Sequence, residues 1–167
     1  ELVMADNGLV NKPGYQPSYM HPKYLGHIKR YLSGLVEVIQ NYIFPKGPVF
    51  IMQIDDELCF GGNYDPFSAD YNNHIITEFY YSFLEEKYAE PKKLPIGYGK
   101  KIKEFAMVEP PVALEITRPE DMIKYFDWID FKCDMINKYV ESIRERLESH
   151  GVGCFFSVNL PWTGDFG

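Results

Sequence analysis

Three consecutive carboxylates, Asp55, Asp56 and Glu57, follow an apolar run over residues 49–54 in which Gln53 is the one polar residue. Such a run is typical of a strand buried on both faces, as in a parallel sheet. Carboxylates at the end of a buried strand are costly unless they have partners or a function. The carboxyl ends of parallel strands are also where α/β proteins bind ligands. We interpret the three acids as a candidate site, and a solvated acidic turn is the alternative.

Neighbouring carboxylates suit general acid/base chemistry or, less well, metal binding. A metal site formed by Asp55 and Asp56 is the weaker hypothesis, because no His lies close by and His74 belongs to the next predicted helix. The cysteines also lack the CxxC spacing of metal sites. We therefore expect no metal and no cofactor.

Composition restricts the class of protein. With 167 residues, 46% of them hydrophobic, the chain can form one domain with a real core. A net charge of -7 argues against nucleic acid as a partner and is compatible with a cationic substrate. The sequence has no apolar run long enough for a membrane span and no signal peptide, so we expect a cytoplasmic protein with no membrane partner. Cys59, Cys133 and Cys154 are expected to be buried free thiols.

The periodicity of apolar residues predicts the elements that position the carboxylates. Helices are expected over residues 22–43, 75–88 and 119–149, and strands over residues 49–54 and 154–160. Residues 1–19 and 58–71 are expected to be loops, and residues 89–119, with five prolines, a long loop-rich excursion. The last helix has the clearest apolar stripe: Met122, Phe126, Ile129, Cys133, Ile136, Val140, Ile143 and Leu147. Asn72 or Asn73 is expected to cap the second helix. The expected inner face of this helix is Ile76, Phe79, Phe83 and Leu84.

Helices that alternate with buried strands indicate an α/β fold with a parallel sheet. Two strands cannot form such a sheet alone, so the chain is expected to be part of something larger. The loop after the acidic cluster carries Phe60, Tyr64, Phe67 and Tyr71. These aromatics either form a stacking wall for a sugar ring or pin the loop onto the body of the protein.

The spacing of Gly47-Pro48, Gln53 and Glu57 resembles the fourth barrel strand of the glycoside hydrolase family 35 and 42 β-galactosidases. The likeness extends over nearly the whole chain, and residues 156–162 resemble the fifth strand. It implies a segment of a (β/α)8 TIM barrel, from about the third helix to the fifth strand. Residues 1–167 would then be a partial catalytic domain with an insertion at about 89–119, incomplete on its own and completed by a missing segment or another chain.

The resemblance also implies residue roles. Glu57 would be the general acid/base of a retaining hydrolase, with the nucleophile, a second Glu, outside this segment. Asn159, Trp162, Phe60 and Tyr64 would contact the oligosaccharide substrate. Asp56 stands where the family has an Asn that contacts the sugar 2-hydroxyl, and a carboxylate there would favour a 2-ammonium group. On that point the sequence resembles the archaeal exo-β-D-glucosaminidases of this family, which remove glucosamine from chitosan oligosaccharides.

Two alternatives stay open at this stage. One is an ordinary β-galactosidase, with Asp56 accepting from a 2-hydroxyl. The other, from a different class, is a carbohydrate-binding or scaffold fragment without turnover. Association into a homo-oligomer is also left open.

Overall fold

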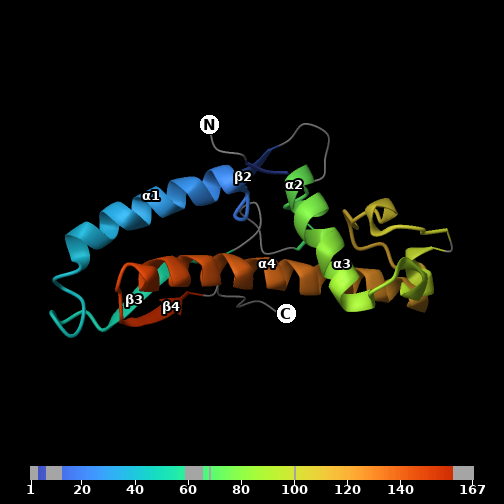
Figure 1. Ribbon diagram of the computed structural model, residues 1–167. Helices are drawn as coiled ribbons and strands as arrows, with labels where there is room; N and C mark the ends of the chain where they lie inside the picture. Colours follow the sequence, from blue (N-terminus) through green and yellow to red (C-terminus); the bar gives the residue numbers. More distant parts are fainter. Residues whose placement is uncertain (1–3, 7–12, 59–65, 68, 100, 160–167) are drawn as a thin grey trace, which may run out of the picture.

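The computed structural model describes residues 4–6, 13–58, 66–67, 69–99 and 101–159. Its longest element, α4 (Met122–Ser149), runs the length of the molecule (Figure 1). Beside the C-terminal half of α4 lie α1 (Pro22–Ile39), β3 (Ile51–Asp55) and β4 (Phe155–Val158). Beside its N-terminal half lie α2 (Asn73–Ile75), the π-helical turn η1 (Ile76–Tyr80) and α3 (Tyr81–Tyr88).

The start of the chain contains regular structure that the sequence did not predict. Strands β1 (Met4–Asp6) and β2 (Pro13–Pro17) pair antiparallel, where a loop was expected. Proline lacks a donor for a sheet ladder but is tolerated at strand ends and free edges. In β2 the prolines stand at the two ends of the strand, so they do not prevent pairing.

Helix α1 begins at Pro22 as predicted, with His21 as its cap, but it ends at Ile39 rather than residue 43. After α1 the chain reverses direction in a turn that two backbone hydrogen bonds close. Val49 N–H donates to the Tyr42 carbonyl, and Phe44 N–H donates to the Val49 carbonyl. Gly47 lets the two sides of this turn approach each other, because a Cβ at that position would overlap the Tyr42 backbone. The turn sets the direction in which β3 leaves α1.

The second helix begins at its predicted cap, where the Asn72 side chain accepts from His74 N–H at 3.1 Å. A π-helical turn follows over η1 and contains one more residue than an α-helical turn would. The buried face is therefore shifted: Tyr80 is fully buried, whereas Phe79 is only partly buried. Phe79 and Phe83, both predicted as inner residues, are partly buried and pack against a hydrophobic core, whereas Tyr80 was not predicted.

The prediction for α4 is right in its C-terminal half and wrong in its N-terminal half. Ile143 and Leu147 are buried as expected, but Met122 and Phe126 are 40% and 53% exposed. A second, larger stripe is buried in their place, formed by Tyr125, Trp128, Phe131, Lys132 and Met135. Of the predicted buried thiols, Cys133 is exposed, Cys154 is half-buried and Cys59 lies outside the described residues.

Two cores lie along α4. The first joins α1, β3, β4 and the C-terminal half of α4, around Leu32, Val36, Tyr139, Ile143 and Leu147. The second joins η1, α3 and the N-terminal half of α4, around Tyr80, Leu84, Trp128 and Phe131. Because α4 contributes to both cores, it connects the strand pair to the α2–α3 half of the molecule.

Residues 89–121 contain short 3-10 turns, at Pro91–Lys93, Ile96–Tyr98, Phe105–Met107 and Pro119–Asp121. Asp127 of α4, fully buried, holds part of this segment to the body. Its carboxylate accepts from the hydroxyls of Tyr88 and Tyr98, each at 2.6 Å, and pairs with Lys87 at 2.7 Å. A buried carboxylate needs such compensation, and here it is supplied by two donors and an ammonium group.

Strands β3 and β4 pair in parallel, in the register Ile51 with Phe155 and Gln53 with Ser157. Parallel pairing is as predicted, but burial on both faces is wrong. Met52, Ile54, Phe156 and Val158 face the helices, because alternate residues of a strand point to opposite faces. On the other face Ile51 is 52% and Phe155 76% exposed.

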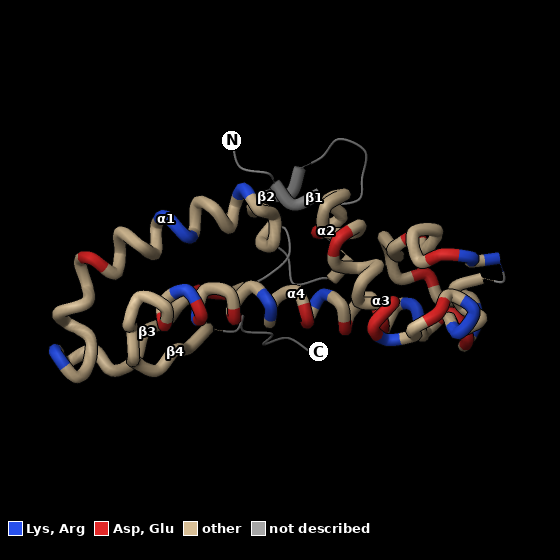
Figure 2. Tube along the Cα trace, in the orientation of Figure 1, with Lys and Arg blue, Asp and Glu red and all other residues tan. Residues whose placement is uncertain are grey.

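Acidic and basic residues are mixed along α3 and α4 (Figure 2). Within the described ranges, no helix has both the length and the apolar content required to cross a membrane.

Lys132 is a buried ammonium in the second core. Its Nζ donates to the Asp70 carbonyl at 2.8 Å and lies 4.4 Å from the centre of the Trp128 ring. Burial lowers the pKa of Lys132 to about 7, against a partial opposing effect of Asp70. The charged form is therefore less stable in the folded protein than in the unfolded chain.

This buried lysine predicts a pH-dependent stability. Between the folded pKa of about 7 and the unfolded value of 10.5, the unfolded chain binds the proton that the folded protein releases. Stability therefore rises with pH across this window and falls as the pH is lowered towards 7. Compared with Lys132→Met, the wild type should gain up to about 1.4 kcal/mol in unfolding free energy per pH unit. Urea denaturation of both proteins at several pH values checks this, and parallel profiles would contradict it.

Candidate active site at the end of β3

The predicted acidic cluster lies at the carboxyl end of β3, beside the carboxyl end of β4. Because the two strands are parallel, both ends meet at the same edge. Glu57 N–H donates to the Asn159 carbonyl at 3.1 Å, and Asn159 N–H donates to the Asp55 carbonyl at 3.5 Å. These bonds extend the pairing beyond the strands and bring Asp56, Glu57 and Asn159 together.

Asp56 is held by two amide side chains. Its Oδ1 accepts from Gln53 Nε2 at 3.0 Å and from Asn159 Nδ2 at 2.9 Å. All three residues are exposed on the open side of the strand pair. Within the described part of the chain, the second oxygen, Oδ2, makes no hydrogen bond, so one oxygen is fixed while the other is available to a ligand.

Asp55 points towards the helices, as expected for the strand neighbour of Asp56. Its Oδ1 accepts from Asp56 N–H at 2.7 Å. Burial raises the pKa of the Tyr139 hydroxyl on α4, and the negative charge of the Asp55 carboxylate raises it further. Tyr139 is 1% exposed. Asp55 is therefore half-buried on the helix side of the strand pair, and the exposed carboxylates are Asp56 and Glu57.

Glu57 has a positive φ of 46°, in the left-handed region that non-glycine residues rarely occupy. A register irregularity between Gln53 and Asp55 precedes it. Such a conformation costs of order 1–3 kcal/mol and persists where surrounding contacts impose it, often at functional sites. Here the contact with Asn159 and the burial of Leu58 hold the turn on both sides. The Glu57 side chain is exposed at the edge of the strand pair.

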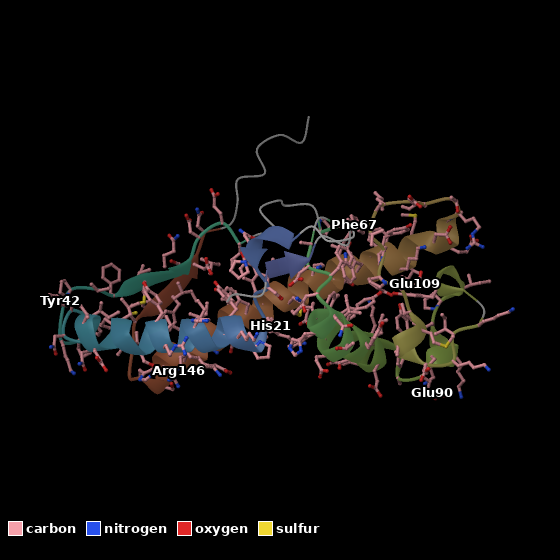
Figure 3. All side chains as sticks on the ribbon, turned by 90° about the horizontal axis from the view of Figure 1, so that it is seen from above. His21, Tyr42, Phe67, Glu90, Glu109 and Arg146 are labelled. Carbon is pink, nitrogen blue, oxygen red and sulfur yellow. The ribbon has the colours of Figure 1, made fainter. Side chains whose placement is uncertain are left out.

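The remaining predicted substrate contacts, Phe60, Tyr64 and Trp162, lie outside the described residues. The aromatics of the same loop that are described pack onto the protein. The Tyr71 ring stacks on the Trp128 ring, with the centroids 5.1 Å apart. The Tyr71 hydroxyl donates to the Pro111 carbonyl at 2.8 Å. Phe67, which is labelled in Figure 3, meets the Tyr125 ring edge-on, with the ring centroids 5.9 Å apart. For these two, the loop-pinning interpretation is correct.

Tyr139 of α4, buried behind the strand pair against Tyr19 and Tyr24, is a core residue that the sequence did not indicate. The predicted apolar stripe of α4 passed over it.

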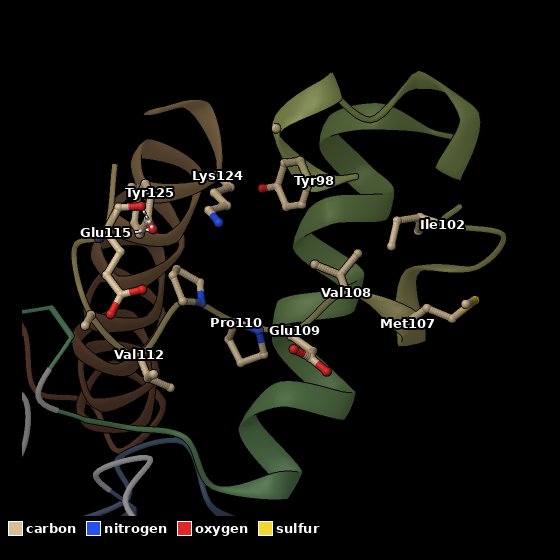
Figure 4. A pocket seen from close by; sticks show the side chains of 13 residues that line it. Tyr98, Ile102, Met107, Val108, Glu109, Pro110, Val112, Glu115, Lys124 and Tyr125 are labelled. Atoms are coloured by element: carbon tan, nitrogen blue, oxygen red, sulfur yellow. Dashed lines mark hydrogen bonds between the residues drawn. The ribbon is translucent and has the colours of Figure 1, made fainter. Parts of the chain in front are cut away.

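A hollow of about 450 Å³ lies at the other end of α4. It is lined by residues between Gly97 and Glu115 together with Lys124 and Tyr125 (Figure 4). No lining residue belongs to β3, β4 or the turn at Glu57, so the hollow is separate from the candidate site.

Comparison with known proteins places these features in a family. The model of glycoside hydrolase family 42, described as β-galactosidase, matches residues 2–164. The chain therefore belongs to glycoside hydrolase family 42, as its Gln–Glu strand indicated. Membership implies a TIM-barrel-type domain.

The curated relatives carry more specific names. The chain is 30% identical over 155 residues to an exo-β-D-glucosaminidase of Pyrococcus horikoshii, covering 89% of this chain and 19% of the relative. It is 31% identical over 153 residues to an exo-β-D-glucosaminidase of Thermococcus kodakarensis, covering 87% and 19%. It is 25% identical over 163 residues to a β-1,2-glucosyltransferase of Ignavibacterium album, covering 96% and 22%. The chain thus spans about a fifth of the length of these relatives.

Proposed function

We propose that this chain carries the acid/base side of a retaining glycoside hydrolase that releases terminal glucosamine from chitosan oligosaccharides. The observation that carries the proposal is the arrangement of Asp56. It stands directly before Glu57, with Oδ1 fixed by Gln53 and Asn159 and Oδ2 available. The names of the two archaeal relatives support the same substrate class.

The proposed mechanism has two steps. Glu57 protonates the glycosidic oxygen as the bond breaks, and a second carboxylate forms a covalent glycosyl intermediate. Glu57 then removes a proton from the water that hydrolyses the intermediate. In retaining enzymes the two carboxyl groups are about 5–5.5 Å apart. We propose that the nucleophile is a second Glu outside this segment, on a later strand of the barrel.

Asp56 is proposed to select the substrate. A glucosaminide carries an ammonium group on C2 at neutral pH, and Oδ2 would accept a charge-assisted hydrogen bond from it. The acidic chain, with a net charge of -7, would favour the approach of cationic oligosaccharides in a salt-dependent way. Asn159 donates to Asp56 Oδ1 and so holds the Asp56 carboxylate in place. In this way it supports the proposed contact between Asp56 Oδ2 and the ammonium group of the substrate.

A panel of matched β-glucosaminides and β-galactosides on the complete protein tests the proposal. We expect a higher kcat/KM for the glucosaminide. β-Galactosidase activity is the second candidate, favoured by the description of the family model, and preference for the galactoside would select it. Absence of turnover with both would favour a non-catalytic binding role.

We further propose that other parts of the barrel cover the open face of β3 and β4. The exposure of Ile51 and Phe155 on that face supports this, because large apolar side chains at that density favour burial. The short span of the chain relative to its relatives agrees with it. What completes the barrel is the remainder of the protein or a second chain.

Phe155→Ser in the complete protein checks this coverage. If Phe155 is buried there, the variant should lose about 3 kcal/mol or more of unfolding free energy. Tyr31→Ser on the outer side of α1, 64% exposed, is the matched control. Its loss should stay near 0.5 kcal/mol, as for ordinary surface changes. If thermal or urea denaturation shows that Phe155→Ser loses as little unfolding free energy as Tyr31→Ser, the proposal that this face is covered is wrong.

A further inference from the structure

Asn159 brings a second polar side chain to the edge where the parallel strands end. It follows β4 directly, and its backbone bonds with Glu57 and Asp55 continue the pairing of the strands. Its side chain is exposed there, like that of Asp56. Asn159 therefore lies where α/β proteins bind ligands, with one donor nitrogen and one acceptor oxygen on its side chain.

The charge of Asp56 fixes which way the Asn159 amide faces. An ionised carboxylate can only accept hydrogen bonds, so the atom 2.9 Å from Asp56 Oδ1 is Nδ2 of Asn159 and not its Oδ1. The same holds for Gln53, whose Nε2 lies 3.0 Å from the same Asp56 oxygen. Each amide turns its donor towards Asp56, and its own side-chain oxygen is left for another partner.

Two acceptor oxygens thus remain at the edge of the strand pair. Among the residues that the structure describes, none donates to Asp56 Oδ2 or to Asn159 Oδ1. The two oxygens belong to side chains that are hydrogen-bonded to each other, so one small group can reach both. Gln53 is placed differently, because it lies inside β3, two residues before the end of the strand. It holds Asp56 from within the strand.

We propose that Asn159 is a second specificity residue for the substituent on C2, with its Oδ1 accepting from the same ammonium group that donates to Asp56 Oδ2. The proposal rests on the proposed function, in which Asp56 faces C2. A primary ammonium has three N–H donors and can serve both oxygens at once, whereas a hydroxyl has one donor and can serve only one. Gln53 is the positioning residue of this arrangement.

Substrates that differ only in the donors on the C2 nitrogen test this on the complete protein. A β-glucosaminide and its N-methyl and N,N-dimethyl derivatives carry the same charge but three, two and one N–H donors. Two donors still serve both oxygens, and one does not. We therefore expect kcat/KM to fall less than about 3-fold on the first methylation and about 10-fold or more on the second. Equal values for the three substrates would show that charge alone is read, and would overturn the proposal.

Asn159→Leu separates a direct contact from a positioning role. It removes the acceptor oxygen with little change of shape, while Gln53 still holds Asp56. If Asn159 Oδ1 binds the ammonium, the second methylation should cost less than about 3-fold in this variant, because the acceptor is already gone. If Asn159 only holds Asp56, the variant lowers kcat/KM for the three substrates by one common factor and the cost of methylation is unchanged.

Ser157→Ala is the matched control. Ser157 is also exposed on β4, two residues before Asn159, and pairs with Gln53 in the strand register. This variant should keep the methylation dependence of the wild type. Gln53→Met should lower kcat/KM for the three substrates by one common factor, as expected of a positioning residue.

The outcomes distinguish this proposal from the proposed function. If Asp56→Asn shifts selectivity but the second methylation costs the same in Asn159→Leu as in the wild type, the role of Asn159 is wrong and the glucosaminide assignment stands. If the complete protein prefers the galactoside and Asp56→Asn leaves the ratio unchanged, the proposed function is wrong and the role of Asn159 fails with it.

Discussion

Glu57→Gln is expected to lower hydrolysis of an oligosaccharide substrate by about 10²–10⁴-fold for each step that needs the carboxyl proton. Gln has the same shape and an amide that cannot protonate the leaving oxygen. Glu57 is exposed and its backbone N–H, not its side chain, makes the bond to Asn159, so folding should be retained. Steady-state kinetics on the complete protein, with thermal unfolding as the folding control, measures the effect.

The same variant should respond differently to an activated substrate. With a dinitrophenyl glycoside the first step needs no acid, so kcat/KM should fall little. The second step still lacks its base, so kcat should fall strongly and the glycosyl intermediate should accumulate. Near-normal hydrolysis of the oligosaccharide by Glu57→Gln would remove Glu57 from the mechanism.

Asp56→Asn is expected to shift specificity from the glucosaminide towards the galactoside. A charged hydrogen bond contributes about 1.5–3 kcal/mol, which corresponds to roughly 10- to 100-fold in the ratio of kcat/KM values. Asn preserves the local structure, because its Oδ1 can still accept from Gln53 and Asn159. The variant therefore changes the charge that faces the ligand and leaves the shape of the site intact.

The ratio of kcat/KM values for matched glucosaminide and galactoside substrates measures this shift. Gln53→Glu is an informative control, because it adds a second carboxylate next to Asp56 in place of a donor. It should disturb the position of Asp56 and lower activity on both substrates. A ratio unchanged by Asp56→Asn would show that Asp56 does not bind the ammonium group.

Periodicity predicted the long elements well. Pro22 begins α1, Asn72 caps the second helix and α4 ends at Ser149, because caps and apolar repeats are encoded within each element. The parallel pairing of β3 and β4 followed from the order of helices and apolar strands. Asp56, Glu57 and Asn159 were expected at one edge, and parallel pairing places them there.

What the sequence did not predict depends on contacts between elements. The π-helical turn at η1 shifts a buried face by one residue, and nothing in the apolar spacing indicates it. The N-terminal half of α4 carries two apolar stripes, and the choice between them is made by the partners that pack on it. Tyr139 is buried by contacts with Tyr19 and Tyr24, which are more than 100 positions away in the sequence, and a local apolar pattern does not indicate such contacts.

Azide reactivation of Glu57→Ala tests the central claim most directly. Azide is already an anion and needs no general base, so it can replace water in the second step once an activated β-glucosaminide has formed the intermediate. If Glu57 is the acid/base of a retaining enzyme, azide should restore turnover and the product should be the β-glycosyl azide, identified by NMR. No reactivation, or an α-glycosyl azide, would contradict the assignment, since the α product is expected when the missing carboxylate is the nucleophile.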